Sequence, residues 1–368
     1  MTDLLHTIKS RVRELSPYTL KTEKTRIKLN QNENPWDAPV EIKDEMLRRL
    51  RDRQWSRYPD LVPEKLHQLL AEYSGWTADG IIAGNGSNEL IQALLMATVS
   101  DGSHVLISEP TFALYRQIAT VLGAEIISVP LTPEFIYDSP SLQSAIQSAN
   151  PDVTIICSPN NPTGCIIPRP DLVSLLQTST GLVIVDEAYF EFVDETAVPL
   201  LEQFRNLVVL RTFSKAMAMA GLRVGYLLAA PELVREIAKT VLPYNLNIVS
   251  QIAAEVALEM YRTTLKPQIS LIRAERNRLF AQLGRIEGLT PVASRANFML
   301  VRSSVSPPTI YKQLLRRNIL IRDVSAYPML HDCFRVTVGT SEENDQLITA
   351  LRDIFARRRK KAIRGQSL

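Results

Sequence analysis

Polar residues follow several short apolar runs in the middle of the chain, and their types could perform covalent chemistry together. Lys215 comes directly after the run 206–211 and the hydroxyl residues Thr212 and Ser214. The weakly polar stretch behind it would remove part of its water, which lowers a lysine pKa and supplies the neutral amine that attacks an aldehyde. Arg223 could bind a phosphate, because a guanidinium engages two oxygens at once. Taken alone, a lysine in an exposed loop would be the simpler interpretation.

Two further polar groups stand where apolar runs end. Asp186 follows the run 181–185, and a carboxylate there needs a cation or a hydrogen-bond donor. It could hold the ring nitrogen of a cofactor protonated, or it could cap a helix or form a structural ion pair. Asn160 and Asn161 follow the run 152–157. A turn explains their composition, but not two adjacent amides at a strand end.

Residues 84–89 read GNGSNE and precede a helical pattern at 87–100. Glycine lets the backbone approach a ligand closely, and the free N–H groups of a helix start attract phosphate. Alone this signal is weak, because loops use glycine routinely. Together with the amine, the arginine and the carboxylate, it completes the groups that pyridoxal 5′-phosphate (PLP) needs.

The elements that must position these groups alternate along the chain. Strand-like runs lie at 104–110, 125–131, 152–159, 181–190, 206–215 and 222–229, and helical patterns lie at 87–100, 111–124 and 139–149. Strands separated by helices predict an α/β fold with a mostly parallel sheet covered on both faces. Ligands bind outside the carboxyl ends of strands in such a sheet, so the polar residues above should meet there.

The last third of the chain has a different pattern. It contains a long helical pattern at 269–286, strand patterns at 296–302, 319–325 and 334–340, and helical patterns at 307–317 and 342–358. We therefore expect three parts: an N-terminal arm (1–30), a large domain with a mostly parallel, mixed sheet (31–256), and a smaller α+β C-terminal domain (257–368).

The composition is that of an ordinary globular protein, with 368 residues, 45% apolar and 22% charged. The net charge of +3 is small and comes largely from the tail 357–364, so we expect no nucleic-acid partner. The three cysteines and four histidines show no metal-ligand spacing, and we expect no metal and a reducing compartment. Residues 1–15 do not resemble a signal peptide, and there is no long apolar run, so a cytoplasmic protein without a membrane span is expected.

The motifs at these strand ends resemble those of the fold-type I, class I/II aminotransferases, and among them the histidinol-phosphate aminotransferase branch. The resemblance extends from about residue 15 to residue 354. The family is indicated by SPNNPTG (158–164), DEAY (186–189) and SKAMAMAGLRVG (214–225), and the branch by LNQNENP (29–35), RYPD (57–60) and two arginines. The resemblance implies a PLP-dependent homodimer. It would transfer an amino group from L-histidinol phosphate to 2-oxoglutarate, giving imidazole-acetol phosphate and L-glutamate in histidine biosynthesis.

The resemblance also implies roles for individual residues around the cofactor. Lys215 would bind PLP covalently and then move a proton, Asp186 would pair with the ring nitrogen, and Tyr189 would bond the phenolate oxygen together with Asn161. The phosphate would be held by Ser87, Asn88, Thr212, Ser214 and Arg223, with Phe112 stacked on the ring and Tyr58 reaching the cofactor of the partner subunit. The family often has tyrosine at the position of Phe112.

For the substrate, the resemblance implies that Arg335 binds the α-carboxylate of glutamate or 2-oxoglutarate. Arg322 would bind the phosphate of histidinol phosphate or the side-chain carboxylate of glutamate, unless it pairs with a carboxylate such as Asp323. The remaining pocket residues would be Tyr18, Asn32 and Tyr244. The chain departs from the family in lacking a glycine in 323–333, so the family resemblance does not define the shape of the entrance to the substrate pocket.

Three other functions are compatible with these motifs. A threonine-phosphate decarboxylase would release carbon dioxide without a keto acid, and an aromatic-amino-acid aminotransferase would not need Arg322. A PLP-binding regulator without catalysis usually carries an added DNA-binding module, and we recognise none in the sequence.

Overall fold

The computed structural model describes residues 4–17 and 23–365, with side chains through Ala356. Its larger sheet contains β2 (Ile81–Gly84), β3 (His104–Glu109), β4 (Glu125–Pro130), β5 (Val153–Cys157), β6 (Leu182–Asp186), β7 (Leu207–Thr212) and β8 (Gly225–Ala229). The strand order is β2-β8-β7-β6-β5-β3-β4, and β8 is antiparallel to both its neighbours while the other pairs are parallel. The predicted mostly parallel, mixed sheet is therefore confirmed.

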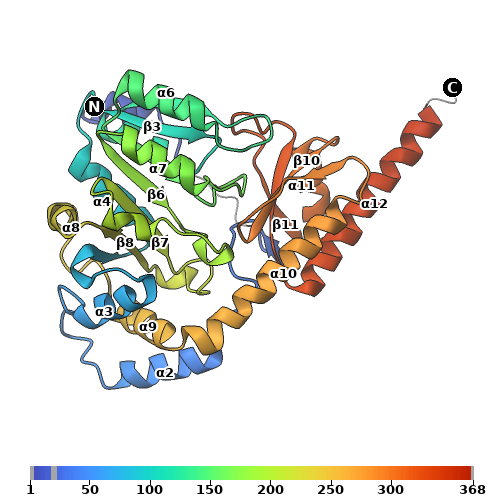
Figure 1. The fold of residues 1–368 in the computed structure, drawn as a ribbon. Helices are drawn as coiled ribbons and strands as arrows, with labels where there is room; N and C mark the ends of the chain where they lie inside the picture. Colours follow the sequence, from blue (N-terminus) through green and yellow to red (C-terminus); the bar gives the residue numbers. More distant parts are fainter. Residues whose placement is uncertain (1–3, 18–22, 366–368) are drawn as a thin grey trace.

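Helices cover both faces of this sheet (Figure 1). They are α3 (Glu64–Ser74), α4 (Ser87–Thr98), α5 (Leu114–Leu122), α6 (Ser139–Ala149), α7 (Arg169–Thr178), α8 (Pro231–Ile237) and α9 (Ile248–Glu259), and α2 (Val40–Arg51) packs on α9. Successive strand side chains point to opposite faces. Val105 and Ile107 accordingly join the apolar cluster beneath α4 and α5, whereas Leu106 joins the cluster beneath α2, α3, α6, α7 and α9. Because both faces of the sheet are buried, the sequences of its strands are continuous apolar runs and do not alternate between apolar and polar residues.

The smaller sheet contains β1 (Ile27–Leu29), β9 (Leu289–Pro291), β10 (Phe298–Ser303), β11 (Ile319–Asp323) and β12 (Cys333–Thr337), in the order β1-β11-β12-β10-β9. It packs with α10 (Lys266–Leu283), α11 (Pro307–Leu315) and α12 (Ser341–Gly365) around a second core. The predicted strands at 296–302, 319–325 and 334–340 are confirmed. The strands β1, β2 and β9 were not predicted, because three or four residues carry too little periodicity.

One nearly continuous helical segment joins the two parts. The π-helical turn η7 (Tyr261–Leu265) follows α9 and leads directly into α10, which extends toward α12 and the smaller sheet (Figure 1). The predicted domain boundary at 256/257 falls inside α9, and β1, from the predicted arm, pairs in parallel with β11. The division into three parts stays a prediction.

The remaining helical elements are short. They are α1 (Ser10–Glu14) and the 3-10 turns η1 (Leu4–Thr7), η2 (Ala78–Gly80), η3 (Phe190–Phe192), η4 (Val198–Glu202), η5 (Ala220–Leu222) and η6 (Ala238–Thr240). Among the described residues, no helix is both long enough and apolar enough to cross a bilayer. The same residues contain no group of three or more His, Cys, Asp or Glu side chains arranged to hold a metal ion.

Candidate active site

A pocket of about 430 Å³ lies where the carboxyl ends of β5, β6 and β7 face the smaller sheet. That volume suits a small organic ligand. The predicted residues that line it are Asn32, Ser87, Asn88, Phe112, Asn161, Asp186, Tyr189, Thr212, Ser214, Lys215, Arg223, Arg322 and Arg335. Segments from across the chain therefore converge at the strand ends, as the parallel topology requires.

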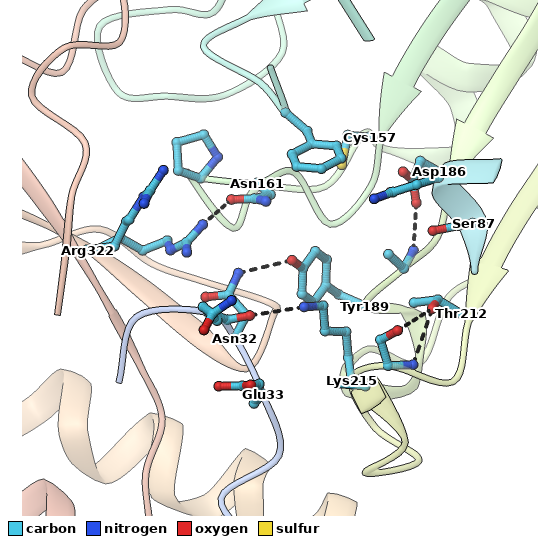
Figure 2. A pocket seen from close by; sticks show the side chains of 18 of the residues that line it. Asn32, Glu33, Ser87, Cys157, Asn161, Asp186, Tyr189, Thr212, Lys215 and Arg322 are labelled. Carbon is cyan, nitrogen blue, oxygen red and sulfur yellow. Dashed lines mark hydrogen bonds between the residues drawn. The ribbon is translucent and has the colours of Figure 1, made fainter. Parts of the chain in front are cut away.

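Lys215 extends into this pocket beside Tyr189, toward the segment that carries Asn32 (Figure 2). Its Nζ donates a hydrogen bond of 3.0 Å to the backbone carbonyl of Gln31. Burial, together with the positive charge of Arg335, lowers the pKa of Lys215 to about 8. A much larger fraction of its amine is therefore neutral near physiological pH than for an ordinary lysine, which suits attack on an aldehyde.

Asp186 ends β6 in a desolvated position, with only 3% of its surface exposed. Its Oδ1 accepts a 2.9 Å hydrogen bond from the Ala188 amide, and its Oδ2 accepts one of 2.5 Å from the Tyr115 hydroxyl. Burial raises the pKa of Asp186, and the two donors act in the opposite direction. A buried carboxylate held in this way can pair with a protonated ring nitrogen.

Tyr189 is buried, and its hydroxyl accepts a 3.0 Å hydrogen bond from Asn32 Nδ2. Burial raises the pKa of Tyr189, so its proton is retained and can be donated to a phenolate oxygen in the pocket. Asn161, on the opposite wall, accepts a hydrogen bond from Arg335 Nη1 through its Oδ1, which leaves its amide nitrogen to act as a donor (Figure 2).

The first turn of α4 forms an anion cradle with Arg223. Gly86, at φ +85°, is the residue before this helix, and a Cβ there would lie 2.4 Å from Arg223 Nη2. Gly225 of β8 is equally constrained, since its Cβ would lie 2.3 Å from the Ser87 amide nitrogen. Two glycines thus allow a guanidinium and a helix start to approach each other. Gly225 was not among the residues predicted to form the site.

Hydroxyl groups complete the cradle. Arg223 Nη1 donates a 3.0 Å hydrogen bond to Ser214 Oγ, and Thr212 Oγ1 lies 3.0 Å from the same oxygen. Arg223 itself adopts a left-handed backbone conformation at φ +54°. Such strain in a residue other than glycine is typical of functional sites. The amine, the buried carboxylate and this cradle together fit a phosphorylated pyridine that carries an aldehyde.

Arg322 and Arg335 enter the pocket from the smaller sheet. Arg335 is buried, and its Nη2 donates a 2.8 Å hydrogen bond to the carbonyl of Asn30. Within the described part of the chain, Arg322 forms no ion pair, and Asp323 instead accepts a 2.6 Å hydrogen bond from Ser325 Oγ. The pairing of Arg322 with Asp323, the alternative considered above, is therefore not observed.

The loop behind Arg322 forms the mouth of the pocket, where Val324 and Tyr327 line the wall. Neither residue was predicted. Met329 has φ +64° in this loop, a conformation that glycine adopts without steric cost. The loop without glycine therefore still makes a left-handed turn, with methionine at that position.

Two predicted residues, Tyr58 and Tyr244, do not line the pocket of the single chain. Tyr58 is 81% exposed, and its ring stacks on that of Tyr244 with centroids 4.5 Å apart. Neither belongs to the pocket wall. Tyr18 lies outside the described residues.

Comparisons with known proteins agree with this arrangement. The sequence profile of the family described as aminotransferase class I and II matches residues 24–351. Among curated proteins, the chain is similar to histidinol-phosphate aminotransferases from Chlorobium phaeovibrioides (36% identity, covering 95% of this chain and 97% of the relative) and Thermoanaerobacter sp. strain X514 (38%, covering 95% and 98%).

Among solved structures, the fold is similar to that of histidinol-phosphate aminotransferase from Sinorhizobium meliloti in complex with pyridoxal-5′-phosphate. The TM-score is 0.86 at 24% identity, covering 94% of this chain and 97% of the other. The enzyme from Clostridium acetobutylicum gives a TM-score of 0.82 at 25% identity, covering 90% and 99%.

Proposed function

The chain belongs to the class I and II aminotransferases, and from this premise we propose that it transfers the amino group of L-histidinol phosphate to 2-oxoglutarate. The products are imidazole-acetol phosphate and L-glutamate, and the reaction is a step of histidine biosynthesis. The extent of identity to curated histidinol-phosphate aminotransferases supports this substrate pair. The observation that carries the proposal is one pocket that contains Lys215, Asp186 and two arginines.

PLP, when bound, supplies the electron sink that makes loss of the proton at the substrate's Cα possible. Lys215 would bind the cofactor through Nζ and would move the proton at the substrate's Cα. Asp186 would hold the proton on the ring nitrogen. Tyr189, through its hydroxyl, and Asn161, through its amide, would each donate a hydrogen bond to the phenolate oxygen.

The phosphate end of the cofactor would be held by the first turn of α4, at Ser87 and Asn88, and by Thr212, Ser214 and Arg223. The positive end of the helix and the guanidinium both favour a dianion there. Phe112 would cover one face of the ring and would exclude water from the reacting atoms.

The substrates share the remaining space. Arg335 binds the α-carboxylate of glutamate, and Arg322 binds either the phosphate of histidinol phosphate or the side-chain carboxylate of glutamate. Both substrates present polar groups at two separated ends, so one pair of guanidinium groups can accept each in turn. Asn32 orients Tyr189 between the two binding regions.

We further propose that the active unit is a cytoplasmic homodimer. Tyr58 would cross the interface to the partner's cofactor phosphate, and Tyr18 and Tyr244 would complete the substrate pocket. The exposure of the stacked pair Tyr58 and Tyr244 supports this role, because aromatic residues are enriched in the buried cores of protein interfaces.

The direct test is to incubate the purified PLP-loaded protein with L-histidinol phosphate and 2-oxoglutarate and to measure glutamate. Turnover that depends on both substrates is expected. Faster turnover of phenylalanine or tyrosine as the amino donor would contradict the proposed specificity. Release of carbon dioxide from threonine phosphate without any keto acid would indicate a decarboxylase instead.

A further inference from the structure

Tyr115 of α5 is a buried pocket residue that contacts two of the groups proposed to bind the cofactor. Its side chain is 1% exposed. The hydroxyl donates a 2.5 Å hydrogen bond to Asp186 Oδ2. The ring lies edge-on to Phe112, with centroids 5.6 Å apart and planes at 85°. One side chain therefore touches both the partner of the ring nitrogen and the residue that covers the ring face.

The hydrogen bond affects the charge state of Asp186. Burial raises the pKa of the Asp186 carboxyl. The hydrogen bond from the Tyr115 hydroxyl opposes this effect, and it lowers the pKa more than any other neighbouring group does. Burial and the negative charge of Asp186 hold the pKa of Tyr115 well above its ordinary value, so the hydroxyl remains a donor. A donor to an ionised group is worth more than one to a neutral group, because it stabilises only the charged form.

We propose that Tyr115 is a positioning residue that keeps Asp186 ionised and directed at the cofactor's ring nitrogen, while its ring supports Phe112. The proposal rests on the proposed cofactor site. It assigns a role to a position that the cofactor does not need to touch. Without the hydroxyl, the buried carboxyl would take up a proton at higher pH, and the neutral acid would no longer pair with a protonated ring.

The test is the affinity of the apoprotein for PLP as a function of pH, measured by equilibrium dialysis without any amino donor. Tyr115→Phe keeps the ring and removes only the hydroxyl. We expect it to bind PLP about tenfold or more weakly, the usual effect of losing a hydrogen bond to a charged group. As pH decreases, the affinity of the variant for PLP should fall at a higher pH than that of the unchanged chain. The reason is that Asp186 of the variant takes up a proton at a higher pH.

Tyr137→Phe is the matched control. Tyr137 is also buried, and its hydroxyl donates a 2.6 Å hydrogen bond to the neutral backbone carbonyl of Cys157. Its loss should lower thermal stability without moving the pH at which PLP affinity falls. If Tyr115→Phe also leaves unchanged the pH at which PLP affinity falls, the positioning role is overturned, and Tyr115 contributes only packing.

A second replacement keeps the test independent of folding defects. The phenol of 3-fluorotyrosine is more acidic than that of tyrosine and a stronger donor, so placing it at position 115 alone should move the acid limb to lower pH. A shift in the other direction, or no shift, would contradict the proposal. Because neither measurement uses histidinol phosphate, failure of the proposed substrate assay would leave this result standing, and the reverse also holds.

Discussion

Arg322 of β11 lies directly opposite Arg335 of β12 in the antiparallel pair. Side chains at such positions leave the same face of the sheet, and like charges placed there destabilise the pairing. The two residues also share the pocket with Lys215. The free protein therefore carries a concentration of positive charge, which a ligand with anionic groups would neutralise.

Replacing Arg322 tests this relationship. We expect Arg322→Gln to lower kcat/KM for histidinol phosphate and for 2-oxoglutarate by about 10- to 100-fold, the loss of a charge-assisted hydrogen bond. The thermal midpoint of the ligand-free protein should stay constant or rise, because one of two facing charges is gone. Arg316→Gln, an exposed arginine outside the pocket, is the control. Unchanged KM values for both substrates would contradict a substrate role for Arg322.

The low pKa of Lys215 predicts how the apoprotein captures its cofactor. The protonated amine cannot attack an aldehyde, and the pKa of Lys215 is about 8. The rate of PLP capture should therefore rise with pH and level off above about pH 8. With an ordinary lysine, the rate would continue to rise until the pH approached the lysine pKa of about 10.4. Stopped-flow absorbance at a series of pH values measures this rate.

The same experiment has two controls. N-α-acetyl-lysine mixed with PLP reports the cofactor's own ionisations. Arg335→Met removes the charge that, after burial, contributes most to lowering the pKa of Lys215, so the plateau should move to higher pH. A capture rate that still increases well above pH 9 in the unchanged chain would show that Lys215 has an ordinary pKa.

The buried ion pair behind the site should matter for stability. Arg211 and Glu187 are 2% and 3% exposed and lie 2.9 Å apart, directly before Thr212 and directly after Asp186. Removing one member of such a pair leaves a buried charge without its partner, so Arg211→Met should destabilise the protein by about 3–5 kcal/mol. Denaturant unfolding measures the loss.

The exposed pair of Arg205 and Glu232 offers a matched comparison. Arg205→Met removes the same group from a solvated pair and should leave the unfolding midpoint almost unchanged. Equal effects of the two substitutions would mean that burial does not decide the contribution of Arg211.

A subunit-mixing experiment tests whether Tyr58 serves the partner's site. Lys215→Ala and Tyr58→Ala chains should each have low activity alone. If Tyr58 acts across the interface, a mixed dimer contains one intact site, and random mixing should restore about a quarter of the sites. Lys215→Ala mixed with Asn161→Ala is the control, because both residues line one chain's pocket and every site then keeps a defect. No recovery in the first mixture would place Tyr58 outside the partner's site.

Much of the pocket could be predicted from the sequence because its residues follow strands. Asp186, Asn161 and Lys215 each come after an apolar run, and parallel strands bring their carboxyl ends to one edge. The helix predicted at 139–149 also matches α6, whose apolar positions recur at helical spacing. Local pattern and parallel topology together were sufficient for these features.

Other features were not predictable from the sequence. The predicted helix at 111–124 begins only at Leu114, so that Thr111 and Phe112 precede it as a loop. The bond between Tyr115 and Asp186 joins positions 71 residues apart, and nothing local in either segment indicates the partner. The facing of Arg322 and Arg335 depends on strand register, and a slip of one residue would turn each side chain to the other face.

The sequence by itself thus determined that the protein can bring an amine, a carboxylate and a phosphate cradle to a ligand, and its resemblance to the aminotransferases implied two further guanidinium groups. Side-chain type and proximity to a strand end are local properties, and they can be read without coordinates. Only the tertiary structure decided which of these groups are desolvated and which face one another. Burial and strand register arise from contacts between distant segments. Burial sets the pKa of Lys215, and the packing of distant segments forms the hydrogen bond between Tyr115 and Asp186. Strand register places Arg322 opposite Arg335.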